Sequence, residues 1–269
     1  MPNNSTANYK YLDFYRRNIG ILTEDEQKTI KNARIAVLGC GGGSDVARQL
    51  TQSGFVNFLL ADYDTVDFHN LNRQFYFQKD IGVNKAKALA ENLHMINPQI
   101  KTEIWQKPVT VDNAKEAVEK SDFIIDAIPP ETALKEEIIL NREIRKYKNK
   151  YHLYFMDIVW GAKVLVFSNS SQTMEEFVGL KPNCDLSDAD KLSLEELTKP
   201  YMENASSEMM RVGGMMYRQE LSYFPQMAVT ISLASSMVAT LCIFLATGKK
   251  IRFAPHIYNI DFFKDFVGD

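Results

Sequence analysis

Cysteine is scarce in this sequence, and no two cysteines lie close together. Cys40, Cys184 and Cys242 are the only three in 269 residues. Their spacing excludes the framework of a disulfide-rich domain and a Cys-x-x-Cys zinc site. We therefore expect no zinc and assign no residue as a metal ligand. A reducing cytoplasmic location is expected for free thiols of this kind.

Charge of one sign is not in excess either. Lys and Arg number 31 against 34 Asp and Glu, which gives a formal net charge of −3. Because no basic stripe is present, nucleic acid is not expected as the main partner. The polar residues 1–8 lack the basic and apolar segments of a signal peptide, and we expect a flexible tail there.

Long apolar runs are also few. The most extended one begins at Phe224 and continues without a charged residue to Gly248. Its length would suit a membrane span, but it contains Gln226 and several Ser and Thr residues. We expect a buried helix in this region and no membrane partner.

Shorter apolar runs alternate with amphipathic segments along the chain. The length allows one large α/β domain or two small ones. Runs rich in β-branched residues predict strands, and segments with helical spacing predict helices between them. The predicted strands are 34–39, 56–61, 101–106, 123–128, 153–159, 162–167 and 257–262, with helices at 44–54, 86–97 and 131–147 among others. This alternation is typical of a mostly parallel, doubly wound sheet.

A cluster of glycines follows the first predicted strand. Its members are Gly39, Gly41, Gly42 and Gly43. The next strand ends in Asp62, about 20 residues further on, where an acidic side chain can accept hydrogen bonds from a ribose. Glycines let the backbone approach a phosphate, and a helix N-terminus offers unpaired N–H groups and a positive dipole. Taken alone, the same pattern also fits a tight turn.

The stretch after Asp62 makes the pattern specific. It contains Asp64, then Asn70-Leu-Asn-Arg73-Gln74, and later Lys85 in Gly-Val-Asn-Lys-Ala. This stretch closely resembles the signature of the ubiquitin-activating enzyme superfamily, including the bacterial ThiF/MoeB-type adenylyltransferases. The resemblance is strongest over 34–98 and continues more weakly from about residue 15 to residue 262. A dehydrogenase needs no such motif after its second strand, so we set an oxidoreductase function aside.

The resemblance implies ATP-dependent adenylation of a carboxylate, with the C-terminus of a ubiquitin-like protein or of a peptide as the expected substrate. It also implies a Rossmann-like fold, a homodimer, and ATP with Mg²⁺ as cofactors. A single adenylation domain is expected over 9–269, with a nucleotide-binding half at 9–150. The half at 151–269 would hold the crossover, dimer-interface and substrate-facing region. A small-molecule or RNA-linked carboxylate is an alternative substrate.

The chemistry of adenylation explains why residues of these types would be needed. Negative charge builds on the phosphates as pyrophosphate leaves, and fixed cations stabilise it. Arg73 can fork onto phosphate oxygens and Lys85 can supply a point charge, so both are candidate catalytic residues. The expected nucleotide-binding residues are Gly39, Gly41, Gly42, Gly43, Asp62, Asp64, Asn70, Arg73, Gln74, Lys85 and Asp126. The alternative is that Arg73 pairs with Asp64 or Asp67 and that Lys85 is a solvated helix residue.

A third candidate catalytic residue is Arg17. It lies in Tyr15-Arg-Arg17-Asn18, where relatives carry Tyr-x-Arg-Gln. In the family the matching arginine reaches into the ATP site of the partner subunit, so the resemblance implies a group supplied in trans. The alternative is a solvated helical arginine.

Two features depart from the family or leave its chemistry open. Shortly after the residue that matches Asp126, relatives usually carry a magnesium-binding Asp followed by Asn; here Pro129 and Pro130 stand there, before Glu131. Asp126 or Glu131 could replace that ligand, or ATP phosphates and water could hold the metal. The departure also fits a non-catalytic binding module or the inactive half of a heterodimer. In the crossover region at 168–223, Cys184 is the candidate for a thioester, and an inert loop cysteine is the alternative.

Overall fold

The protein is built on one seven-stranded sheet. The computed structural model describes residues 10–268, apart from the side chains of Pro130 and Glu131, and the predicted tail at 1–8 lies outside the described residues. The strands are β1 Arg34–Leu38, β2 Asn57–Ala61, β3 Lys101–Trp105, β4 Phe123–Asp126, β5 Tyr151–Ile158, β6 Gly161–Phe167 and β7 Ile257–Asp261. Their order is β3-β2-β1-β4-β5-β6-β7. The first five are parallel to one another, and β6 is antiparallel to both of its neighbours, β5 and β7.

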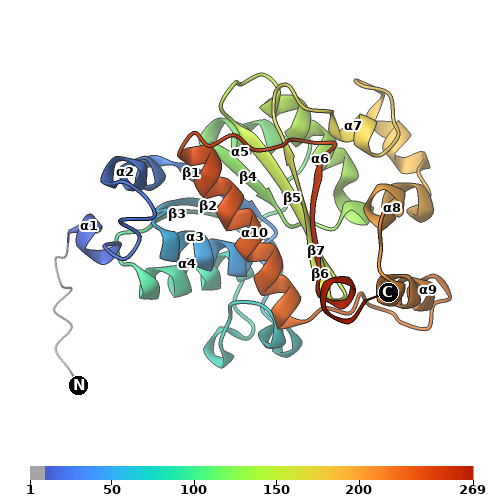
Figure 1. Cartoon of the computed structure of the whole chain (residues 1–269), viewed down its shortest axis with the longest axis horizontal. Helices are drawn as coiled ribbons and strands as arrows, with labels where there is room; N and C mark the ends of the chain where they lie inside the picture. Colours follow the sequence, from blue (N-terminus) through green and yellow to red (C-terminus); the bar gives the residue numbers. More distant parts are fainter. Residues whose placement is uncertain (1–9, 269) are drawn as a thin grey trace.

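This arrangement confirms the predicted Rossmann-like α/β fold with a mostly parallel, doubly wound sheet (Figure 1). The chain enters at β1 in the middle, moves outward to β3, and returns to β4 on the other side of β1. Neighbouring strands β1 and β4 therefore lead into connections that diverge at their carboxyl ends, which is where ligands bind in open α/β sheets. The predicted halves 9–150 and 151–269 share this sheet, because β4 pairs with β5.

Helices cover both faces of the sheet. They are α1 Tyr11–Phe14, α2 Glu24–Asn32, α3 Gly43–Ser53, α4 Lys85–Ile96, α5 Ala114–Lys120, α6 Pro130–Ile144, α7 Met174–Phe177, α8 Leu194–Met202, α9 Ser207–Tyr217 and α10 Ala228–Ala246. Short helical turns lie at Phe68–Asn72, Gln78–Asp80, Leu186–Lys191 and Phe263–Val267. In Figure 1, α3, α4 and α10 lie in front of the sheet, and α5 and α6 lie behind it.

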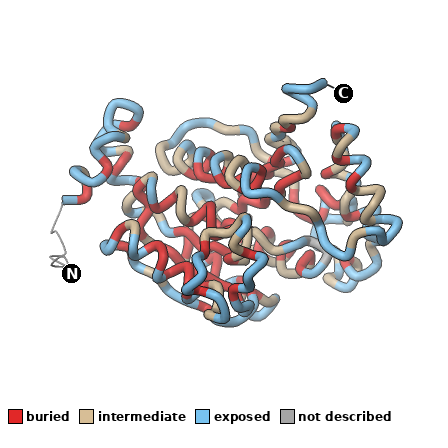
Figure 2. The backbone as a smooth tube through the Cα atoms, turned by 90° about the horizontal axis from the view of Figure 1, so that it is seen from below, coloured by how far each residue is buried: buried red, intermediate tan, exposed pale blue. Residues whose placement is uncertain are grey.

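The alternation of side chains along each strand explains how the sheet packs against a layer of helices on each of its two faces. Ile35 and Val37 pack with α3, α4 and α10, whereas Ala36 and Leu38 pack with α5 and α6. Successive strand residues point to opposite faces, and both faces are covered, so the central strands β1, β2 and β4 are nearly continuous buried apolar runs. Figure 2 shows the buried residues concentrated in the centre of the molecule.

The long apolar run forms α10. This helix is long and apolar enough to cross a membrane by length and composition. It packs on α3, β5 and β6, and its side chains Ala234, Val238 and Cys242 are completely buried. Val229, by contrast, is 52% exposed, and Phe244 is also exposed. One side of α10 thus belongs to the core, and the other carries apolar side chains at the surface.

The N-terminal segment closes over the far end of α3. The Tyr11 hydroxyl donates to the carbonyl of Gly54 at 2.7 Å, and the Tyr15 hydroxyl donates to that of Thr51 at 2.8 Å. Gly54 has φ +120°, and a Cβ there would lie 2.0 Å from Nε2 of Gln27. Only glycine fits this junction. Burial raises the pKa of Tyr11 to about 12.

Candidate functional site

The glycine loop joins β1 to α3 and packs against the end of β4. Gly39 has φ +85°, and a Cβ on it would lie 2.8 Å from the carbonyl oxygen of Ala127. A Cβ on Gly43 would lie 2.5 Å from Cγ1 of Val37. Both positions therefore need glycine, the first for its conformation and contact and the second for close helix–strand packing. Gly42 precedes the first residue of α3, so the N-terminus of this helix opens at the loop.

The segment after β2 lies against the same loop. A Cβ on Gly41 would lie 3.3 Å from Nε2 of Gln74. The Ser44 hydroxyl donates to the Gly41 carbonyl at 2.7 Å and accepts from the N–H of Phe75 at 2.9 Å. The Tyr76 hydroxyl donates to the Cys40 carbonyl at 2.6 Å. The predicted motif residues from 70 to 76 are thus held beside the glycines.

Asp62 links the end of β2 to the glycine loop. Its Oδ2 accepts from the backbone N–H of Cys40 at 2.8 Å, and its Oδ1 accepts from that of Asp64 at 2.8 Å. Burial raises the pKa of Asp62, while these hydrogen bonds and nearby Lys85 act against the rise. A carboxylate has about four acceptor positions, so Asp62 keeps acceptor capacity beyond these two bonds.

Lys85 is paired rather than solvated. Its Nζ lies 2.9 Å from Oδ2 of Asp64, and its side chain is only 12% exposed. Its backbone N–H donates to the Asp64 carbonyl at 2.8 Å. The preceding residue, Asn84, caps α4 by accepting from the N–H of Lys87 and also donates to the Asp62 carbonyl. The start of α4 thus places the ammonium group beside the end of β2.

Arg73 does not make the ion pair that the alternative interpretation predicted. Its Nε donates to Oε1 of Gln226 at 2.8 Å, and its Nη1 donates to the His69 carbonyl and to Oδ1 of Asn72. Among the described residues, no ion pair joins Arg73 to Asp64 or Asp67. Asn70 is buried and accepts from the Asp67 N–H at 2.9 Å, so part of its side chain shapes the loop that carries Arg73.

Asp126 requires a correction. The sequence predicted a carboxylate facing the nucleotide, but the side chain is completely buried, with Oδ2 3.0 Å from Nε2 of His152 and Oδ1 accepting from the Ile128 N–H at 3.1 Å. Asp126 lies two residues after Ile124, which packs against α5 and α6, and strand alternation turns both side chains to that face. Asp126 thus stabilises the turn after β4 by accepting from the Ile128 N–H, on the face of the sheet that α5 and α6 cover.

A magnesium ion held by protein ligands does not fit this turn. Pro129 has no side-chain oxygen, and Asp126 faces the interior. Within residues 10–268, no group of three or more His, Cys, Asp or Glu side chains is arranged to hold a metal ion. The side chain of Glu131, the other predicted replacement, is outside the described part of the structure.

Arg17 and Cys184 lie away from the glycine loop of their own chain. Arg17 is exposed beside the C-terminal end of α3, whose 11 residues separate it from the loop by about 16 Å. The carbonyl of Cys184 accepts from Nη2 of Arg142 at 2.7 Å, near the C-terminal end of α6, whereas α6 begins at the carboxyl end of β4. Burial raises the pKa of the Cys184 thiol, although Arg142 opposes this.

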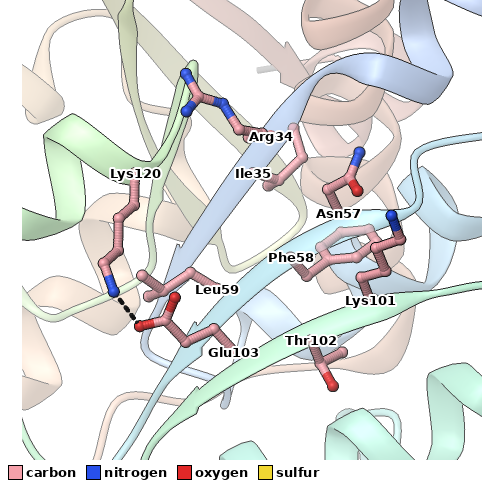
Figure 3. Close-up of a pocket in the computed structure, with 9 residues that line it drawn as sticks. All are labelled: Arg34, Ile35, Asn57, Phe58, Leu59, Lys101, Thr102, Glu103 and Lys120. Atoms are coloured by element: carbon pink, nitrogen blue, oxygen red, sulfur yellow. Dashed lines mark hydrogen bonds and ion pairs between the residues drawn. The ribbon is translucent and has the colours of Figure 1, made fainter.

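Two surface hollows flank the sheet. The one drawn in Figure 3 has a volume of about 280 Å³ and is lined by residues at the amino ends of strands, among them Arg34, Asn57 and Lys101. It lies at the opposite end of the strands from the glycine loop. The second, of about 260 Å³, is lined by Trp160, Val212, Met215 and Gln226 among others. Gln226 joins this second hollow to Arg73.

Sequence reasoning missed Gln226, Asp157 and His152. The first two come from segments far from the motif in sequence, and no local pattern marks them. Asn84 had a detectable signal, because an Asn directly before a helical run is a common N-cap.

A glycine loop between β1 and α3, an acidic side chain after β2, and a doubly wound, mostly parallel sheet define a Rossmann-like α/β protein. More narrowly, the chain belongs to the ThiF family, whose pattern matches residues 15–268.

Similar sequences include ubiquitin-like modifier-activating enzyme 5 of Caenorhabditis elegans, which is 37% identical over 99 residues, 36% of this chain and 23% of that enzyme. Adenylyltransferase and sulfurtransferase UBA4 of Lodderomyces elongisporus is 33% identical over 102 residues, 37% of this chain and 22% of that enzyme. The matched segments thus span less than a quarter of these curated relatives.

Solved structures share the fold over nearly the whole chain. PaaA superposes with a TM-score of 0.71 at 19% identity, covering 96% of this chain and 82% of PaaA. Escherichia coli MccB with MccA-N7isoASN gives a TM-score of 0.67 at 18% identity, covering 94% of this chain and 72% of MccB. At these identities the likeness establishes the fold alone.

Proposed function

We propose that this protein adenylates a carboxylate with ATP. The observation that carries the proposal is the assembly at the carboxyl ends of β1 and β2, where Asp62 and Gln74 contact the glycine loop and Lys85 and Arg73 lie on the same segment. Glycine N–H groups and the start of α3 suit phosphates, and Asp62 suits ribose hydroxyls. The names of the relatives, an activating enzyme and an adenylyltransferase, support the same chemistry.

The cations have distinct roles in this proposal. Lys85 would exchange its contact with Asp64 for a phosphate oxygen, and Arg73 would meet charge that grows as pyrophosphate leaves. Asn70, Asp64 and Gln74 would hold the segment that presents Arg73. Magnesium, as the ATP-bound ion, would be held mainly by phosphate oxygens and water, because Pro129 has no side-chain oxygen and Asp126 faces the interior.

The proposed assembly is a cytoplasmic homodimer. The exposed apolar side of α10, with Val229 and Phe244, is the surface that a second copy would cover. Arg17 lies at the far end of α3 from its own glycine loop, so it would act only across a subunit boundary. The proposed substrate is the C-terminal carboxylate of a ubiquitin-like protein or peptide.

The experiment that tests this function is ATP–pyrophosphate exchange with a panel of carboxylates. Ubiquitin-like proteins and peptides with a free C-terminus should support exchange, because in this proposal the C-terminal carboxylate oxygen attacks the α-phosphate. The same peptides with an amidated C-terminus are the matched control and should give none.

The second candidate function is a non-catalytic binding module, which Pro129 and the inward-facing Asp126 favour. ATP binding without exchange on any carboxylate of the panel would select it over the enzyme.

Asp62 provides a separate test of the nucleotide site. Asp62→Ala should weaken ATP binding by about 1–3 kcal/mol, because the ribose loses its acceptor and the glycine loop loses its link to β2. Calorimetry with ATP measures this change. Asp112→Ala, which removes an exposed carboxylate elsewhere, is the control and should leave affinity unchanged. Equal affinity in Asp62→Ala and wild type would move the nucleotide away from this loop.

A further inference from the structure

Three side chains from distant segments form a hydrogen-bonded chain that ends on Arg73. Asp157 lies near the end of β5, Gln226 precedes α10, and Arg73 follows the helical turn at Phe68–Asn72. Oδ1 of Asp157 accepts from Nε2 of Gln226 at 2.9 Å, and Oε1 of Gln226 accepts from Nε of Arg73 at 2.8 Å. Thr230, one turn into α10, also approaches Asp157, with its hydroxyl 3.5 Å from Oδ2.

The chemistry of the two ends fixes the orientation of the amide between them. A guanidinium only donates hydrogen bonds, and an ionised carboxylate only accepts them. Gln226 must therefore turn its oxygen to Arg73 and its nitrogen to Asp157. The reverse orientation would place two donors against each other and two acceptors against each other.

Burial makes this arrangement stiff. Asp157 is 6% exposed, and burial raises its pKa, whereas the Gln226 bond and the charge of Arg73 act against the rise. A buried carboxylate needs its donors, because leaving it without them is costly. Asp157 therefore holds Gln226 in place. The side-chain oxygen of Gln226 is in turn fixed as the acceptor for Nε of Arg73.

The segment just before Arg73 also holds its guanidinium group. Nη1 donates to the His69 carbonyl at 3.1 Å and to Oδ1 of Asn72 at 2.9 Å. Across the described range 10–268, no hydrogen bond is recorded for Nη2 of Arg73. With Nε and Nη1 occupied, the plane of the guanidinium is fixed. The next residue, Gln74, lies against the glycine loop.

We propose that Gln226, anchored by Asp157, is a positioning residue that orients the Arg73 guanidinium for the reacting phosphate. The proposal rests on the adenylation function given above. Its distinguishing property is that Gln226 touches neither nucleotide nor carboxylate and acts only by reducing the orientations open to Arg73. A guanidinium already aimed at the phosphates need not reorganise as charge develops.

The first test is spectroscopic and needs no activity. In ¹H–¹⁵N spectra of the whole protein, the Arg73 Nε–H signal is assigned by its absence in Arg73→Lys. Exchange of this proton with water should be at least tenfold faster in Gln226→Met, which keeps the side-chain length and removes the acceptor. Gln78→Met, which changes an exposed glutamine, is the matched control and should leave exchange unchanged. Unchanged exchange in Gln226→Met would overturn the proposal.

The second test is kinetic. In single-turnover adenylate formation, Gln226→Met should lower the rate at saturating ATP by about tenfold to a hundredfold, with the half-saturating ATP concentration changed by less than about twofold. Asp157→Leu should behave alike, and Asp157→Asn should restore much of the rate, because its amide oxygen can still accept from Gln226. If the Arg73 Nε–H exchanges faster in Gln226→Met but the rate of adenylate formation at saturating ATP is unchanged, the positioning role is refuted.

The two tests separate this inference from the proposed function. A wild-type protein that forms no adenylate would refute the adenylation function, and the exchange of the Arg73 proton would then decide the geometry alone. A rise in half-saturating ATP with a constant saturated rate would identify Gln226 as part of ATP binding and would also overturn the positioning role.

Discussion

Arg73→Ala should slow adenylate formation about a hundredfold to a thousandfold at saturating ATP, a loss of about 2.7–4 kcal/mol of transition-state stabilisation. Charge on the phosphates grows toward the transition state, so a preorganised cation contributes more there than in the ground state. Bound ATP would keep its contacts with the glycine loop, Asp62 and Lys85, so the affinity of the protein for ATP should fall much less. Pro129 strengthens the expectation, because it offers no side-chain oxygen through which a metal could share the task.

Single-turnover adenylation and ATP calorimetry on the same preparations test this result. Arg252→Ala, which removes an exposed arginine outside the site, is the control and should match wild type in both. A variant that loses affinity but keeps its saturated rate would make Arg73 an anchor for ATP and would contradict a catalytic role.

His152→Leu should destabilise the fold by about 3–5 kcal/mol, because it removes the partner of a buried carboxylate while filling most of the space. Oδ2 of Asp126 would lose its contact with Nε2 of His152, and only the Ile128 N–H would remain. The penalty is large because a charge in the interior has no water to replace the lost donor. Urea unfolding followed by circular dichroism measures the change.

Two further variants separate charge from packing. His152→Gln keeps a nitrogen near the position of Nε2 and should recover part of the loss. Asp126→Asn combined with His152→Leu removes the charge, so the double variant should be more stable than His152→Leu alone. A loss below about 1 kcal/mol in His152→Leu would show that Asp126 does not depend on this partner.

The layout of the glycine loop beside the end of β2 could be predicted because it depends on local spacing. The glycines follow β1, and Asp62 and Asp64 follow β2, in one strand–helix–strand unit where spacing alone brings the ends of the two strands together. Lys85 begins the next helix, α4. The fold could be predicted for the same reason, since most strands are separate apolar runs bounded by a helix or a turn.

The remainder depends on contacts that no spacing encodes. Arg73 and Gln226 are 153 positions apart, and Gln226 and Asp157 are 69 apart, so their meeting depends on the path of the crossover region. Asp126 was misjudged for a smaller reason. The end of a strand indicates which edge of the sheet a residue occupies, whereas the face it points to depends on alternation with residues such as Ile124.

The tight contacts of the glycine loop bear on how such a site changes over evolution. Any side chain on Gly39 would meet the Ala127 backbone, and one on Gly43 would meet Val37, so selection for folding alone would keep both glycines in a lineage that had lost its chemistry. Arg73 and Lys85 have no comparable protection, because their contacts are polar and lie near the surface. Drift would erase these cations first. Among relatives, this pair of cations would therefore be a more sensitive marker of retained activity than the glycines beside them.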